Sequence, residues 1–158
     1  MTLPSEERLQ HALDAAYRFL ARRDRTVAEV RERLEAQEID AEVVDEAVAE
    51  LTRQGYLDDA RYAHRFAEDR RTIDAWGAER IERRLLAVGV EPALIAAAIG
   101  ERGAAKELEA ALTVLRRRFP HAPTDDRDRD RALGLLVRKG YDLDLAYDAV
   151  RAYERDAA

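Results

Sequence analysis

A repeat of about fifty residues constrains the fold of this chain more than any other feature. The segments VRERLEAQEIDAEVVDEAV (30–48), IERRLLAVGVEPALIAAAI (81–99) and ALGLLVRKGYDLDLAYDAV (132–150) align with an offset of 51 residues both times. Their apolar residues recur three and four positions apart, the spacing typical of amphipathic helices. The repeat therefore predicts tandem helical modules that support one another end to end.

Each repeated segment is predicted to form a helix, a tight turn and a second helix. The matching positions are Val30, Ile81 and Ala132; Leu34, Leu85 and Leu136; Ile39, Val90 and Tyr141; and Val48, Ile99 and Val150. The second helices follow Asp40, Glu91 and Asp142, which are predicted N-caps because a carboxylate can accept from the free N–H groups of a first turn. Pro92 suits the first helical position.

A longer helix is expected before each pair, at roughly 6–22, 58–73 and 103–119. Thr26 and Glu29 predict a capping box between the first and second helices. Glycine and proline are few and alternating strand patterns are absent, so the predicted class is all-α. We expect three modules, at 1–55, 56–102 and 103–158, in an elongated, curved arrangement that offers a broad surface and no deep cleft.

The composition limits the cellular compartment and the kinds of binding site that we expect for this chain. The chain of 158 residues has no cysteine, which excludes disulfides and thiolate metal sites and fits a reducing cytoplasm. The first residues lack the apolar core of a signal peptide, and no apolar run approaches the ~20 residues of a membrane helix. We expect a soluble cytoplasmic monomer. The net charge of −6 argues against a general nucleic-acid coat, although residues 60–90 carry 7 basic and 5 acidic groups.

The stretch RQGYLDDARYAHRFAEDRR (53–71) contains two adjacent carboxylates, which could serve catalysis, metal binding or the start of a helix. With Asp58 as N-cap, Asp59 lies in the first turn, and Leu57 can pack on Tyr62 as a hydrophobic staple. Gly55 can take the left-handed conformation that ends the preceding helix. The structural interpretation accounts for every residue of GYLDD.

A catalytic or metal site would need further groups. His11, His64 and His121 are scattered, and the chain has no glycine-rich phosphate loop and no local Ser–His–Asp grouping. We therefore expect neither an enzyme nor a cofactor or metal. The segment PHAPTD (120–125) is a predicted loop, and Asp125 and Asp126 are predicted to start the next helix.

Six arginines are candidates for binding a partner: Arg61, Arg65, Arg70, Arg80, Arg83 and Arg84. On the helix after Gly77, the residues Ile81, Leu85 and Val88 share an inward face. Arg80, Arg83 and Arg84 flank that face, which should leave their charged ends in solvent. Two interpretations stay open. The arginines either pair with nearby carboxylates such as Glu79 and Glu82 on a solvated surface, or they form a basic face for a partner.

The same residues resemble a known family. GYLDDARYAHRFAEDR followed by GAERIERRLLAVGV (77–90) is similar to the signature of the RecX family, and YRFLARRDRTVAEVRERL (17–34) is similar to its first-module pattern. The residues that carry the central motif are Gly55, Tyr56, Leu57, Asp58, Asp59, Tyr62, Phe66, Gly77, Ile81, Leu85 and Gly89. Glu38 departs from the pattern, because the family usually has glycine there, as Gly89 and Gly140 do.

The resemblance implies tandem three-helix modules that bind along the groove of the RecA recombinase filament on single-stranded DNA. It implies inhibition of strand exchange and of RecA's ATPase activity, with filament disassembly, and hence a role in regulating DNA recombination and repair. Single-stranded DNA is then a second expected partner, contacted directly or through the filament. The alternatives are a helix-turn-helix-like protein that binds nucleic acid without RecA, and a small helical enzyme.

Overall fold

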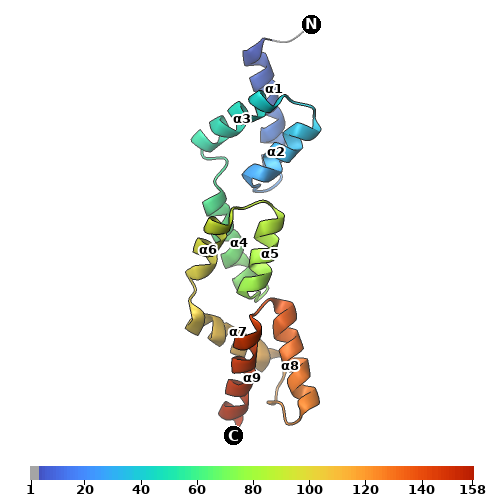
Figure 1. The fold of residues 1–158 in the computed structure, drawn as a ribbon, viewed down its shortest axis with the longest axis vertical. Helices are drawn as coiled ribbons and strands as arrows, with labels where there is room; N and C mark the ends of the chain where they lie inside the picture. Colours follow the sequence, from blue (N-terminus) through green and yellow to red (C-terminus); the bar gives the residue numbers. More distant parts are fainter. Residues whose placement is uncertain (1–3) are drawn as a thin grey trace. The chain divides into compact units, whose positions relative to one another are not determined.

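The computed structural model describes residues 4–158, and all regular secondary structure in this range is helical (Figure 1). The helices are α1 (Ser5–Leu20), α2 (Val27–Ala36), α3 (Ala41–Arg53), α4 (Asp59–Ile73), α5 (Ala78–Ala87), α6 (Pro92–Gly100), α7 (Ala104–Arg118), α8 (Asp126–Lys139) and α9 (Leu143–Ala157). The all-α prediction is confirmed. The longer helices α1, α4 and α7 occur where they were expected, with ends that differ by one or two residues. Within the described range no helix has both the length and the apolar character needed to cross a membrane.

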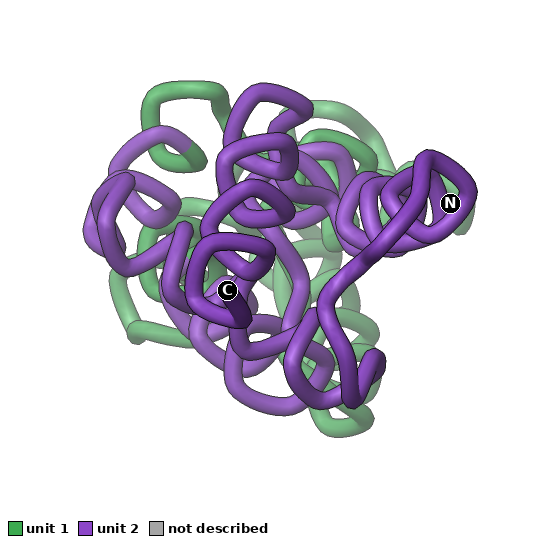
Figure 2. The backbone as a smooth tube through the Cα atoms, turned by 90° about the horizontal axis from the view of Figure 1, so that it is seen from below, with its two compact units in different colours: residues 1–63, 85–95 green, residues 64–84, 96–158 purple. Residues whose placement is uncertain are grey.

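The chain divides into two compact units (Figure 2). Unit 1 comprises residues 1–63 and 85–95, and unit 2 comprises residues 64–84 and 96–158. In unit 1, α1, α2 and α3 pack against one another around a core that includes Leu34 and Leu51. In unit 2, α7, α8 and α9 pack around a core that includes Leu115 and Leu136. Because both units take residues from α4, α5 and α6, the predicted module boundaries at 55 and 102 stay a prediction.

The repeat seen in the sequence is a repeat of buried positions. Leu34, Leu85 and Leu136 are all fully buried. Val30 and Ile81 are fully buried as well, and Ala132 is 1% exposed. On each of these short helices, the apolar residues spaced three and four positions apart are therefore buried, as the spacing predicts.

The three turns that follow α2, α5 and α8 share a left-handed backbone. The φ angles are +59° at Glu38, +85° at Gly89 and +99° at Gly140. Glycine adopts this conformation without strain, whereas for a residue with a Cβ atom it costs roughly 1–2 kcal/mol of conformational free energy. Glu38 is therefore strained, and the turn keeps its shape although it has glutamate where the other two turns have glycine.

Several of the predicted helix caps are confirmed, the cap at Asp40 is wrong, and the cap at Glu91 stays a prediction. Thr26 and Glu29 form the reciprocal capping box at α2. The Asp125 carboxylate accepts from the Asp128 N–H at 2.8 Å, and the Asp142 carboxylate accepts from the Leu145 N–H at 3.3 Å. At α3 the prediction is wrong, because the Asp40 side chain accepts no capping bond. Its carboxylate lies 3.3 Å from the Arg8 guanidinium, which attracts it away from the helix terminus.

Candidate partner-binding surface

The stretch GYLDD ends one helix and starts the next, as its sequence predicts. Gly55 follows α3 with φ +84°. Asp58 precedes α4, and its Oδ1 accepts from the Arg61 N–H at 3.0 Å. Leu57 is 1% exposed and belongs to the core of unit 1. The Leu57–Tyr62 staple stays a prediction. The local contacts of Asp58 thus serve the start of a helix.

Asp59 makes a contact that the sequence does not reveal. Its Oδ1 accepts a hydrogen bond of 2.9 Å from the backbone N–H of Val27, the first residue of α2. Burial raises the pKa of the Asp59 carboxyl, and the bond from Val27 opposes that rise only in part. Asp59 therefore ties the start of α4 to the start of a helix in the preceding repeat.

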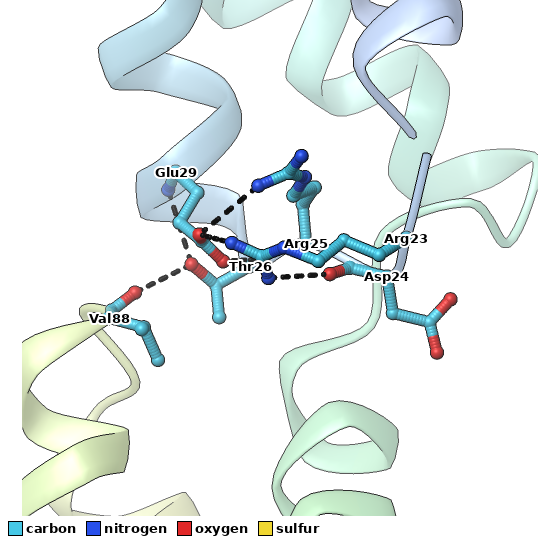
Figure 3. A network of polar contacts seen from close by, with 6 residues as sticks. All are labelled: Arg23, Asp24, Arg25, Thr26, Glu29 and Val88. Carbon is cyan, nitrogen blue, oxygen red and sulfur yellow. Dashed lines mark hydrogen bonds and ion pairs between the residues drawn. The ribbon is translucent and has the colours of Figure 1, made fainter. Parts of the chain in front are cut away.

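Thr26 makes a second tie at the same end of α2 (Figure 3). Its side chain is fully buried, and its hydroxyl donates to the carbonyl of Val88 at 2.6 Å while accepting from the Glu29 N–H at 3.1 Å. Glu29 in turn lies 2.9 Å from the Arg23 guanidinium and 3.8 Å from that of Arg25. The turn after α5 is thereby joined to the first turn of α2 inside unit 1.

Similar hydrogen bonds occur 51 residues later, within unit 2. The N–H of Gly77 donates to the carbonyl of Lys139 at 2.8 Å, and these residues occupy the positions of Thr26 and Val88. A carboxylate again covers the next N–H, since Glu107 accepts from Ala78 at 2.9 Å. Glu107 is 8% exposed and also lies 3.3 Å from Arg102. At equivalent positions, the Thr26 hydroxyl and the Gly77 backbone N–H therefore each donate to a carbonyl of the following repeat, and a buried or half-buried carboxylate accepts from the next N–H.

The other residues of the motif have structural surroundings. The ring of Tyr56 meets that of Tyr17 edge-on at 5.3 Å, and the ring of Phe66 meets that of Trp76 edge-on at 6.0 Å. Tyr62 is half-buried. A Cβ atom on Gly77 would lie 2.5 Å from the backbone of Gly140, so this close approach requires glycine.

His64 is half-buried on α4 and lies 3.1 Å from the Glu101 carboxylate. Among residues 4–158, no group of three or more histidine and acidic side chains gathers as metal ligands would.

Arg80 differs from its prediction. Its guanidinium lies 4.2 Å from the centre of the Trp76 ring and donates to the carbonyl of Arg138 at 3.2 Å. The expectation that its charged end projects freely into solvent is wrong, because an aromatic face and a carbonyl of unit 2 hold it. Arg80 is half-buried on α5, and its role in binding a partner stays a prediction.

Arg83 and Arg84 match their prediction. Both are exposed on α5, and neither forms a hydrogen bond or ion pair within the described part of the chain. On this helix Arg83 lies opposite the buried Ile81 and Leu85, and Arg84 flanks them. These two side chains are therefore accessible to a partner.

The remaining arginines are distributed rather than gathered. Arg61 belongs to unit 1 and donates to the Gly55 carbonyl at 2.7 Å. Arg70 lies 2.5 Å from the Asp74 carboxylate, 5.8 Å from the Phe66 ring and 5.9 Å from the Trp76 ring. Arg65 is exposed on α4. These arginines therefore have different local contacts, and their common role in binding a partner stays a prediction.

Comparison with known proteins gives two family models that match consecutive parts of the chain. The model described as RecX, first three-helix domain, matches residues 12–51, and the model described as RecX, second three-helix domain, matches residues 58–99. Together these ranges cover more than half of the chain.

Similar whole proteins are named Regulatory protein RecX. The protein of Trichlorobacter lovleyi is 38% identical over 136 residues, which are 83% of this chain and 88% of the relative. That of Amycolatopsis mediterranei is 31% identical over 98% of this chain and 89% of its own. The crystal structure of RecX from Lactobacillus salivarius matches the fold with a TM-score of 0.84 at 18% identity, over 95% of this chain and 99% of that one.

Proposed function

The chain belongs to the RecX family of regulatory proteins, and from that premise we propose that it binds the RecA filament on single-stranded DNA and inhibits strand exchange and ATP hydrolysis. The observation that carries the proposal is the family match over residues 12–51 and 58–99, the second of which includes α5. We further propose that it acts in the cytoplasm as a monomer.

The exposed cations of α5 support a protein partner. Arg83 and Arg84 have no carboxylate to pair with inside the described residues, so their charges are available to an acidic surface. Such complementarity speeds association and weakens with added salt. Tandem modules also allow several modest contacts to act together on neighbouring subunits of a filament, which raises the overall affinity.

A steady-state assay of RecA's ATPase activity on single-stranded DNA tests this proposal. Adding the protein should lower the rate in a concentration-dependent manner, and RecA-mediated strand exchange should fall over the same range. An unchanged rate at a large excess of the protein would refute the proposal.

A further inference from the structure

Unit 2 contains two adjoining hollows, each of about 610 Å³, which share Arg118 and Leu135. The end of α4 and parts of α7 and α8 line the first hollow, and the loop after α7 and parts of α8 line the second. Volumes of this size accommodate small ligands or a segment of an extended chain. Since the two share a wall, they form one continuous surface, here termed the basic groove.

Positive charge dominates the lining of the basic groove. Its basic side chains are Arg71, Arg102, Arg117, Arg118, Arg127, Arg131, Arg138 and Lys139. Its acidic side chains are Asp74 and Asp130. The Asp74 carboxylate is already paired with Arg70, which does not line the groove. The groove thus concentrates cations on a protein whose net charge is −6.

Several of these cations are available to a ligand. Arg117 and Arg127 are exposed and form no hydrogen bond or ion pair with any described residue. Arg71 is held in place, because its guanidinium donates to the Ile99 carbonyl at 2.8 Å. Its Nε atom is buried and has no partner in residues 4–158. The groove therefore combines exposed outer charges with a hydrogen-bonded, half-buried inner one.

Apolar surface lies beside the charges. Ile73 is 70% exposed and lines the first hollow. Phe119 lines the second, with the guanidinium groups of Arg118 and Arg131 at 5.4 Å and 5.9 Å from its ring centre. Proteins that hold single-stranded nucleic acid use a related combination, in which cations follow the backbone and aromatic side chains such as Phe119 stack on the bases.

We propose that the basic groove binds the phosphodiester backbone of single-stranded nucleic acid. The seven arginines present planar forks that suit phosphate oxygens. A strand carries one negative charge on every residue, which suits a groove lined by several cations better than an acidic peptide of mixed composition does. Two of these cations already have carboxylate partners, since Arg102 lies 3.3 Å from Glu107 and Arg131 lies 4.0 Å from Asp128. The lining includes neither Arg83 nor Arg84 of α5, and its occupancy does not require RecA.

The test is the binding of a fluorescently labelled oligothymidylate to the full chain without RecA, followed by anisotropy across a range of salt. Arg117→Glu combined with Arg127→Glu should weaken binding at least about tenfold. The slope of log affinity against log salt should fall by about 1.4, because each single-strand phosphate contact contributes about 0.7. Both side chains are exposed, so circular dichroism should show unchanged helix content.

Arg18→Glu combined with Arg22→Glu is the matched control, since it makes the same charge change on exposed residues of unit 1. This variant should bind like the parent. The proposal is overturned if the parent does not bind the oligonucleotide at ~0.1 M salt, or if the control weakens binding as much as the test variant. Displacement by polyglutamate or by a nucleoside triphosphate as effectively as by unlabelled strand would also overturn it. Because RecA is absent, none of these results bears on the proposed inhibition of the filament.

Discussion

Glu38 is held in a backbone conformation that suits glycine. Its φ of +59° places it in the left-handed region, whereas the equivalent turns have Gly89 and Gly140. The Ile39 N–H still donates to the Leu34 carbonyl at 3.3 Å, as Val90 does to Leu85 at 3.0 Å. The turn after α2 therefore keeps the same hydrogen bond as the turn after α5, although it has glutamate where that turn has glycine.

Glu38→Gly should raise the free energy of unfolding by up to about 1 kcal/mol, since relief of left-handed strain outweighs the greater freedom of glycine in the unfolded chain. Urea denaturation measures the change. Glu32→Gly removes the same charge from an exposed position inside α2 and should lower stability by about 0.5–1 kcal/mol. Equal losses in the two variants would show that Glu38 is not strained.

Asp59 combines a useful hydrogen bond with an unfavourable buried charge. Asp59→Asn keeps an oxygen that can accept from the Val27 N–H, and it removes the charge. We expect its stability at neutral pH to equal or exceed that of the parent. Asp59→Ala leaves the Val27 N–H without an acceptor and should cost about 1–3 kcal/mol, measured by urea denaturation.

The stability of the parent relative to Asp59→Asn should depend on pH. Since burial raises the pKa of Asp59 in the folded protein, the folded state binds the proton more tightly than the unfolded chain does. The contribution of Asp59 to stability therefore falls as pH rises from the unfolded pKa through the folded pKa. Acidification from neutral pH should favour the parent over Asp59→Asn, and a constant difference across that range would contradict this explanation.

At the scale of the element, α5 separates a structural face from an accessible one. Leu85 is fully buried, whereas its neighbour Leu86 is 48% exposed. Leu85→Ala should lower the free energy of unfolding by about 2–5 kcal/mol, because it leaves a cavity. Leu86→Ala is the matched control and should change stability by less than about 0.5 kcal/mol. Thermal or urea denaturation distinguishes them, and similar losses would show that the register of α5 is wrong.

Features that depend on residues close together in the chain can be predicted from the sequence. Apolar residues at helical spacing identify Ile81 and Leu85 as buried, and the Thr26–Glu29 capping box follows from a separation of three residues. Tertiary partners are not encoded by such spacing. The bond from Val27 to Asp59 spans 32 residues, and the bond from Arg80 to the Arg138 carbonyl spans 58. Local spacing therefore does not distinguish Arg80 from Arg83, and only the packing around Trp76 separates them.

The basic groove could not be predicted from local spacing either. Arg71, Arg117 and Arg127 are far apart in the chain, and each lies among carboxylates or other arginines that favour an ordinary solvated surface. Only the packing of unit 2 brings them to one surface. By contrast, the family resemblance depends on a contiguous motif, so the order of the residues alone is enough to predict it.

At the scale of the whole molecule, the arginines of the central repeat have two kinds of role. Arg70 and Arg80 stabilise the protein through Asp74, Trp76 and a backbone carbonyl. Arg83 and Arg84 are exposed without partners among the described residues and are available for binding. A test of partner binding must therefore change Arg83 and Arg84 and leave Arg70 and Arg80 intact.

The most direct measurement is inhibition of RecA's ATPase activity on single-stranded DNA by Arg83→Glu combined with Arg84→Glu, at ~0.1 M salt where charges interact over about 10 Å. Exposed charges contribute little to stability, so the melting temperature should stay close to that of the parent. We expect this variant to lose most of the inhibition shown by the parent, while Arg18→Glu with Arg22→Glu keeps it. A folded Arg83→Glu, Arg84→Glu variant that inhibits as strongly as the parent would contradict the assignment of α5 to the RecA filament.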